Sequence, residues 1–215
     1  MKAEIYESFD NNVEKQINIV DNILNNSLSL YKKMLNLNNS FSELKLLPNG
    51  NNELIKRLFE ELGYSVYFPR KGDNSERFDA LISNEEIKTV VEIEIPSTAI
   101  LDAPRNLLDD YAVIKNRKSN FNNDIVPLVI CWDLPNKRTD YWNVIFDINN
   151  ILKVRIKTIS ILALATHYWT DTPLDLKNDD YYLDSTNSSM NTVKELLRNR
   201  GISPDSFSGY FSPFK

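Results

Sequence analysis

Apolar residues follow two different periods along this 215-residue chain, and the period predicts which segments form helices and which form strands. Between residues 13 and 35 they recur at helical spacing, so one amphipathic helix is expected there. Residues 51–63, NNELIKRLFEELG, carry the same pattern, and their final glycine is the expected end of a second helix. A third helix is expected over residues 102–117, because Asp102 can cap it and Pro104 suits its first turn.

Strand patterns occupy the segments between these helices. The run YSVYF follows the second helix directly, and RFDALI and IKTVVEIEI flank the turn at residues 83–86, which predicts a β-hairpin. Residues 125–132 are nearly all apolar, as expected of a strand covered on both faces, and VRIKTISILALAT predicts another buried strand or strand-like run. A helix or irregular segment is expected over residues 141–151, and a helix near residues 191–200 that Gly201 ends. This order predicts an α/β fold, a mixed central sheet flanked by helices.

Length and composition fit one domain better than two, with 42% hydrophobic and 26% charged residues, as in ordinary globular proteins. We expect a single domain over residues 1–215, with an N-terminal helical extension over 1–50, a core over 51–165 and a C-terminal extension over 166–215. The longest apolar stretch is far too short to span a membrane, and the first residues lack a signal-peptide pattern. A cytoplasmic protein without a membrane partner is therefore expected.

Single residues exclude several kinds of chemistry. Cys131 is the only cysteine and lies in an apolar run, so we expect an inert core thiol rather than a disulfide or a zinc ligand. His167 is the only histidine and is flanked by apolar and aromatic residues, so a core imidazole is expected rather than a catalytic base. The net charge of −5 argues against a protein that coats DNA by charge alone, although an enzyme that holds a polyanion through a metal can be acidic.

Three carboxylates stand out on the predicted hairpin. If its turn is centred just after Asn84, Asp79 faces Val90, and the alternation of side chains places Asp79, Glu92 and Glu94 on one face. Like charges placed together are unfavourable unless a cation compensates them. Mg²⁺ suits such a cluster, with Mn²⁺ as a substitute, because it takes carboxylate, water and phosphate oxygens. The cluster therefore indicates metal-dependent hydrolysis of a phosphodiester.

Other interpretations of these residues stay open. Glu92 and Glu94 can instead be the solvent side of an amphipathic strand, paired with Lys88 or with a neighbouring helix. Arg105 can reach a phosphate or be an ordinary surface arginine. Basic pairs such as residues 137–138 can hold backbone phosphates or be scattered solubilising charge.

From about residue 51 to 132 the chain resembles the restriction-endonuclease-like (PD-(D/E)XK) nuclease superfamily. The signature of that superfamily is an Asp on one hairpin strand and a Glu-x-Lys on the next, after a helix and a first strand. This chain has Phe78-Asp79 and then Glu92-Ile93-Glu94. Phe78 replaces a frequent proline and Glu94 replaces the lysine, as in the Glu-x-Glu of some type II restriction enzymes. The resemblance implies that Asp79 and Glu92 bind the metal and that Glu94 is a metal or water partner.

The resemblance also implies a function: a Mg²⁺-dependent endonuclease that cuts double-stranded DNA, as a type II restriction enzyme or a related defence nuclease. A homodimer is expected, since both strands must be cut. The alternative is a catalytically silent nuclease-fold module for nucleic-acid binding or assembly, which Glu94 in place of lysine and the acidic pI of about 5.1 favour. A third interpretation is a protein-interaction protein that uses the N-terminal helix and the aromatic C-terminus.

Overall fold

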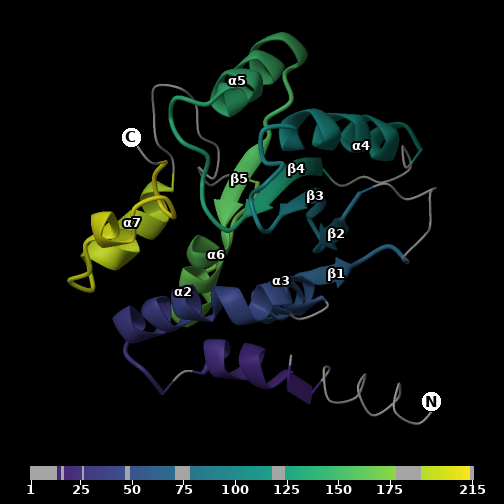
Figure 1. The fold of residues 1–215 in the computed structure, drawn as a ribbon. Coiled ribbons are helices and arrows are strands. Elements are labelled where there is room, and N and C mark those ends of the chain that lie inside the picture. The colour runs from purple at the N-terminus through teal and green to yellow at the C-terminus, as the bar shows by residue number, and fades with distance from the viewer. Residues whose placement is uncertain are drawn as a thin grey trace, which may run out of the picture. The chain divides into compact units, whose positions relative to one another are not determined.

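The structure, a computed structural model, describes residues 14–15, 17–25, 27–46, 49–70, 78–117, 124–177 and 190–213 (Figure 1). The chain divides into two compact units, Met1–Leu58 and Phe59–Lys215. The expected single domain, with its boundaries after residues 50 and 165, stays a prediction. None of the helices within the described ranges combines the length and the apolar character that crossing a bilayer requires.

The first unit is helical. Residues 17–24 form a helix, and α2 (Leu30–Leu46) and the first part of α3 (Gly50–Glu61) follow it. The single helix expected over residues 13–35 is wrong, because the chain leaves the helix at Asn25. The Oδ1 atom of Asn25 accepts a hydrogen bond from the backbone N–H of Ser27 at 2.9 Å, and such local bonds favour turns over helix. Within this unit the buried apolar residues include Val20, Ile23, Met34, Leu37 and Leu44.

The second unit is built on a five-stranded mixed sheet in the order β1-β2-β3-β4-β5. The strands are β1 (Ser65–Tyr67), β2 (Ala80–Ser83), β3 (Ile87–Glu94), β4 (Asp124–Cys131) and β5 (Lys157–Ser160). β2 runs antiparallel to both of its neighbours, β1 and β3, whereas β4 runs parallel to β3 and β5 runs parallel to β4. The predicted α/β class, with a mixed sheet flanked by helices, is confirmed.

The hairpin between β2 and β3 forms as predicted, but its register is shifted by two residues. Ala80 pairs with Val91, and the same register continued by one step sets Asp79 opposite Glu92. The turn is centred one residue later than expected, because Asn84 Oδ1 accepts hydrogen bonds from two backbone N–H groups beyond it, each at 2.9 Å. A shift of two residues preserves the alternation of side chains, so the face assignment of the acids is unaffected.

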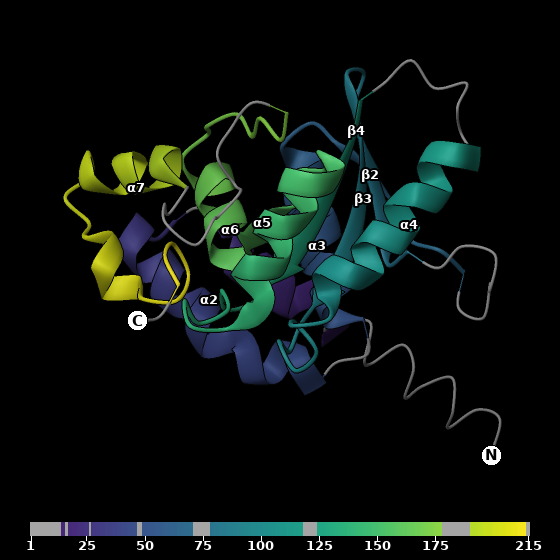
Figure 2. The same cartoon turned by 90° about the horizontal axis from the view of Figure 1, so that it is seen from above.

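Helices α4 (Ala103–Arg117) and α5 (Asp140–Leu152) lie on the same side of the sheet (Figures 1 and 2). From α4, the Asn106 side chain donates to Glu92 on β3. From α5, the Tyr141 hydroxyl hydrogen-bonds Thr158 on β5 at 2.8 Å. Glu92 and Thr158 both pair with one residue of β4, Val129, and therefore share a face of the sheet. The two helices thus cover the face that carries the acids.

The run VRIKTISILALAT, residues 154–166, is only partly a strand. After β5 ends, Ser160 Oγ accepts a hydrogen bond from the Ala163 N–H at 3.1 Å and caps α6 (Ile161–Trp169). The predicted strand is therefore wrong beyond residue 160. Residues 161–167 are all buried, so the sequence lacks the polar positions that would have revealed a helical period.

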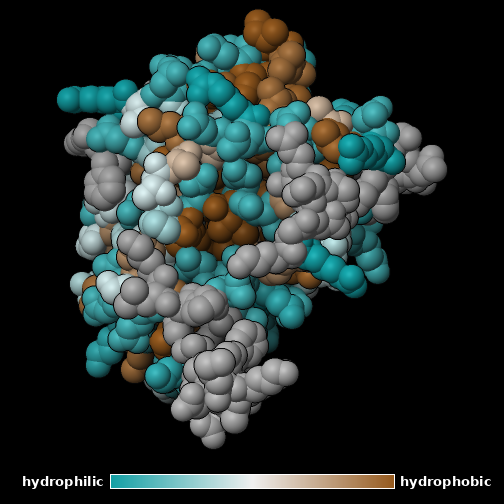
Figure 3. Space-filling view, turned by 45° about the vertical axis from the view of Figure 1, so that its right-hand side comes forward, coloured by the Kyte–Doolittle hydropathy of each residue, from teal (hydrophilic) through white to brown (hydrophobic). Residues whose placement is uncertain are grey.

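The C-terminal part contains α7 (Asn191–Arg198) and a 3₁₀ turn, η1 (Pro204–Phe207). The predicted helix and its end are confirmed, with Gly201 at a φ of 70°. Cys131 and His167 are buried, as expected of core residues, and His167 Nδ1 lies 3.2 Å from the Thr172 carbonyl oxygen. Apolar surface is visible over α5, at the top of Figure 3, where Phe146, Ile151 and Leu152 are exposed.

Candidate functional site

The three predicted site residues lie on or beside the hairpin of the second unit. Asp79 directly precedes β2, and Glu92 and Glu94 lie near the carboxyl end of β3. The Ile93 backbone N–H donates to Asp79 Oδ2 at 2.7 Å, which holds the Asp79 carboxylate against β3. The antiparallel pairing thus brings an acid of one strand beside two acids of the next, as the sequence predicted.

Helix α4 supplies further polar groups to Glu92. Asn106 Nδ2 donates to Glu92 Oε1 at 3.2 Å. Asp110, one turn further along α4, is buried and close enough to Glu92 to raise the pKa of that carboxyl. Glu92 is therefore hydrogen-bonded on one side and surrounded by negative charge.

The polypeptide beyond β3 and β4 closes the edge of the sheet around Glu94. Glu94 is 9% exposed, and the Ala99 backbone N–H hydrogen-bonds its carboxylate. Ser97 Oγ lies 3.3 Å from the Glu94 carbonyl oxygen and 3.5 Å from that of Asp133. Because β3 and β4 are parallel, their carboxyl ends meet at this edge, and Ser97 links them there.

Desolvation and mutual repulsion raise the pKa values of these three carboxyl groups. Partial burial and then the nearby charge of Asp79 raise the pKa of Glu92 to about 7, and the hydrogen bond from Asn106 opposes this rise. Burial raises the pKa of Glu94 as well, with smaller contributions from Asp79 and Asp102. The pKa of Asp79 is raised by desolvation and partly restored by the Ile93 N–H.

Among the described residues, no Lys or Arg forms an ion pair with Asp79, Glu92 or Glu94. Nor does any set of three His, Cys, Asp or Glu side chains in those ranges converge tightly enough to hold a metal ion by itself. Mg²⁺ requires less, since one or two carboxylates with water and substrate phosphate complete its shell. The oxygen-rich, cation-free donor set of this site fits such an ion.

Sequence reasoning did not single out Asn106 and Asp110 as site residues. A signal for Asp110 exists, because Ala103, Leu107, Asp110 and Ile114 are the buried residues of one helical stripe, and a carboxylate within an apolar stripe is unusual. Asn106 carries no such signal, because the surrounding polar residues of α4 are mostly exposed.

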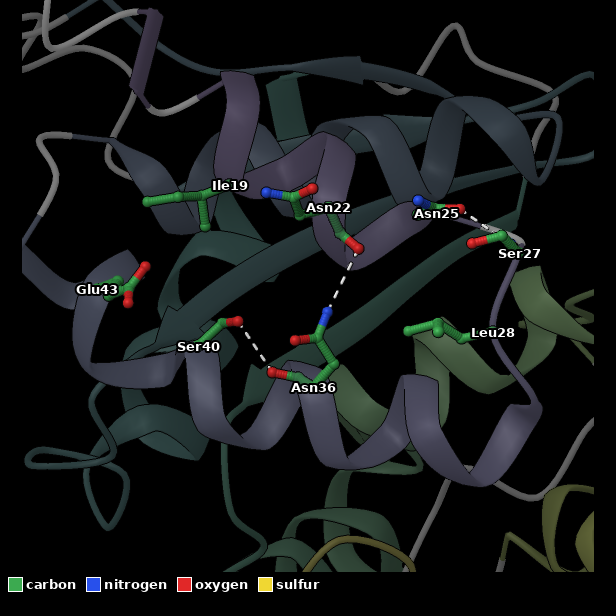
Figure 4. Close-up of a pocket in the computed structure, with 8 residues that line it drawn as sticks. All are labelled: Ile19, Asn22, Asn25, Ser27, Leu28, Asn36, Ser40 and Glu43. Carbon is green, nitrogen blue, oxygen red and sulfur yellow. Dashed lines mark hydrogen bonds between the residues drawn. The ribbon is translucent and has the colours of Figure 1, made fainter.

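A pocket of about 340 Å³ lies in the first unit and offers no comparable chemistry (Figure 4). Its lining is mainly Asn and Ser side chains, with Glu43 as a single carboxylate. Two of these polar groups are already used: Asn36 Nδ2 donates to the Asn22 carbonyl at 3.3 Å, and Ser40 Oγ donates to the Asn36 carbonyl at 2.9 Å. The acids of the hairpin remain the better candidate site.

Comparison with known protein families and with curated protein sequences gave no match for this chain. The functional argument therefore depends on the geometry of the site and on the resemblance carried by its motif.

Proposed function

We propose that the protein is a metal-dependent endonuclease that hydrolyses phosphodiester bonds of double-stranded DNA. The observation that carries the proposal is the gathering of Asp79, Glu92 and Glu94 on one hairpin, with raised carboxyl pKa values and with no ion pair to a Lys or Arg of the described chain. A bound divalent cation would compensate the charge of such a group of acids.

Each acid has a role in this proposal. Asp79 and Glu92 would hold the cation, because they lie opposite each other and Asn106 and the Ile93 N–H orient their oxygens. A bound Mg²⁺ would supply charge neutralisation at the phosphate and a lower pKa for the attacking water. Glu94, with its own pKa raised, is suited to accept a hydrogen bond and then a proton from that water.

The order of elements supports the same proposal. Helix α3, strand β1, the β2–β3 hairpin, helix α4 and the parallel strand β4 follow one another as the restriction-endonuclease-like resemblance implies. A type II restriction enzyme or a related defence nuclease fits this arrangement best. It would act as a homodimer, since one such site cuts one strand of a duplex.

A second candidate is a catalytically silent module of the same fold that binds nucleic acid. Two observations favour it: Glu94 stands where the resemblance expects a lysine, and within the described ranges the acids do not close into a three-ligand set. The two candidates differ in metal binding, because a silent module has no need of a divalent ion.

Isothermal titration calorimetry of Mn²⁺ into the purified protein distinguishes the nuclease from the silent module. We expect binding that the double variant Asp79→Asn/Glu92→Gln weakens by roughly tenfold or more, because both carboxylate ligands are lost. Glu86→Gln, in the exposed turn of the same hairpin, is the matched control and should bind Mn²⁺ like the unmodified chain. Equal affinities for all three proteins would contradict the proposed site.

A further inference from the structure

Arg105 begins a row of basic residues beside the acid site. Its guanidinium lies 3.7 Å from Asp102 and 3.6 Å from Asp140, and its side chain is 57% exposed. Exposed ion pairs of this length are weak, so a phosphate can replace either carboxylate. Its ion-pair partner Asp102 is close enough to Glu94 to contribute to the raised pKa of that carboxyl. A phosphate bound by Arg105 would therefore lie beside the acids.

The loop between β4 and α5 presents the next two basic residues, Lys137 and Arg138, both exposed. The loop is held from both ends. The Leu134 N–H donates to the Gly209 carbonyl at 2.7 Å, and the Trp142 indole N–H lies 3.2 Å from the carbonyl oxygens of residues 135 and 136. The loop leaves the carboxyl end of β4, the edge where the acid site lies, so the backbone that carries these two charges is held at that edge.

Helix α7 contributes Lys194 and Arg198, which are one helical turn apart. Burial lowers the pKa of Lys194, and the positive charges of Arg198 and then Lys137 lower it further, against the opposing effect of Asp205. Lys137 of the loop and Arg198 of the helix thus both lie within electrostatic range of the Lys194 ammonium group. Within the described residues neither Lys137 nor Arg198 forms an ion pair.

We propose that Arg105, Lys137, Arg138 and Arg198 form a basic track that binds the phosphates of one DNA duplex beside the acid site. The choice of DNA as the polyanion rests on the proposed function. Cations gathered on neighbouring elements repel one another until a polyanion neutralises them, and phosphate contacts of this kind position a duplex without reading its bases. On a chain whose net charge is −5, such a local track is what lets DNA approach the acids.

The test measures binding without cleavage. Fluorescence anisotropy of a short labelled duplex, in EDTA and over a series of salt concentrations, gives the affinity and its salt dependence. Lys137→Gln/Arg198→Gln removes two exposed charges and should lower the slope of log K against log salt by about 2, because each lost phosphate contact accounts for about 0.9. At low salt its affinity should fall by roughly tenfold or more.

Lys153→Gln/Arg155→Gln is the charge-matched control, since these residues precede β5 and lie toward the opposite end of the parallel strands. It should retain the slope of the unmodified chain. Equal slopes for the two double variants, or no duplex binding by the unmodified chain, would overturn the track. Because the assay contains no metal, the track can hold while the chain proves unable to cleave DNA. Conversely, suppose that the two double variants show equal salt slopes while cleavage still depends on the acids. That result would reject the track and leave the proposed nuclease function standing.

Discussion

Glu92 lies among other carboxylates and accepts a hydrogen bond from the Asn106 amide. The resulting pKa of about 7 means that near neutral pH this carboxyl is protonated in a large fraction of metal-free molecules. In the unfolded chain the pKa returns to 4.5, so between these two values the folded state binds more protons than the unfolded state. Stability contributed by this group is therefore complete below pH 4.5 and falls as the pH rises to about 7.

Glu92→Gln in metal-free protein should consequently stabilise the fold at alkaline pH. The amide cannot ionise, so at pH ~8 we expect the free energy of unfolding to rise by about 1–3 kcal/mol, a range reduced for solvent screening of this half-buried group. At pH ~4 the two proteins should differ little, because both residues are then neutral. Urea unfolding at the two pH values measures both quantities. An increase that is the same at both, or one that Glu86→Gln reproduces, would show that ionisation of Glu92 is not the cause.

Ser160 joins two elements and the C-terminal segment. Its hydroxyl accepts the Ala163 N–H at 3.1 Å, which starts α6, and donates to the Tyr210 carbonyl at 2.7 Å. Because Ser160 is fully buried, removing its hydroxyl leaves the buried Ala163 N–H and the half-buried Tyr210 carbonyl without this hydrogen-bond partner.

Ser160→Ala should therefore lower the free energy of unfolding by about 2 kcal/mol, the sum of a lost helix cap and an unsatisfied carbonyl. Ser203→Ala is the matched control, since Ser203 caps η1 without a side-chain hydrogen bond and should change stability by less than about 0.5 kcal/mol. Thermal or urea unfolding compares the two variants. Equal losses would mean that the cap of α6 contributes nothing of its own.

The sequence predicted well those elements whose apolar period, or whose starting and terminating residues, lie within the segment itself. Helix α3 ends at Glu61, two residues before Gly63, which has a φ of 86°, and α4 carries its proline in the first turn. Both features follow from short-range signals. Helix α6 was missed because complete burial removes its polar face. The first helix was extended too far because the hydrogen bond that ends it, from the Ser27 N–H to the Asn25 side chain, has no strong sequence signature.

The acids of the candidate site were predictable, and their surroundings were not. Side-chain alternation assigns Asp79, Glu92 and Glu94 to one face in either register, which is why an error of two residues left the prediction intact. Placing Asn106 near Glu92 requires the packing of α4 on β3, which depends on contacts distant in sequence. The same holds for the approach of Lys137 to Lys194.

Over the chain as a whole, the net charge is −5, but acidic and basic side chains are unevenly distributed. Acids concentrate at the carboxyl end of β3, and the basic track runs from α4 across the loop after β4 to α7. A uniformly acidic surface would repel DNA, whereas the proposed track would let DNA approach the acids where the proposed cation neutralises them.

The most direct test of the nuclease assignment is cleavage. Purified protein incubated with unmethylated phage DNA and Mg²⁺ or Mn²⁺ should give discrete fragments. Asp79→Ala and Glu94→Ala should reduce the rate by about a hundredfold or more, EDTA should abolish cleavage, and Glu86→Gln should cut normally. No cleavage of duplex DNA, single strands or RNA, together with no metal binding, would contradict the account and leave a silent binding module in its place.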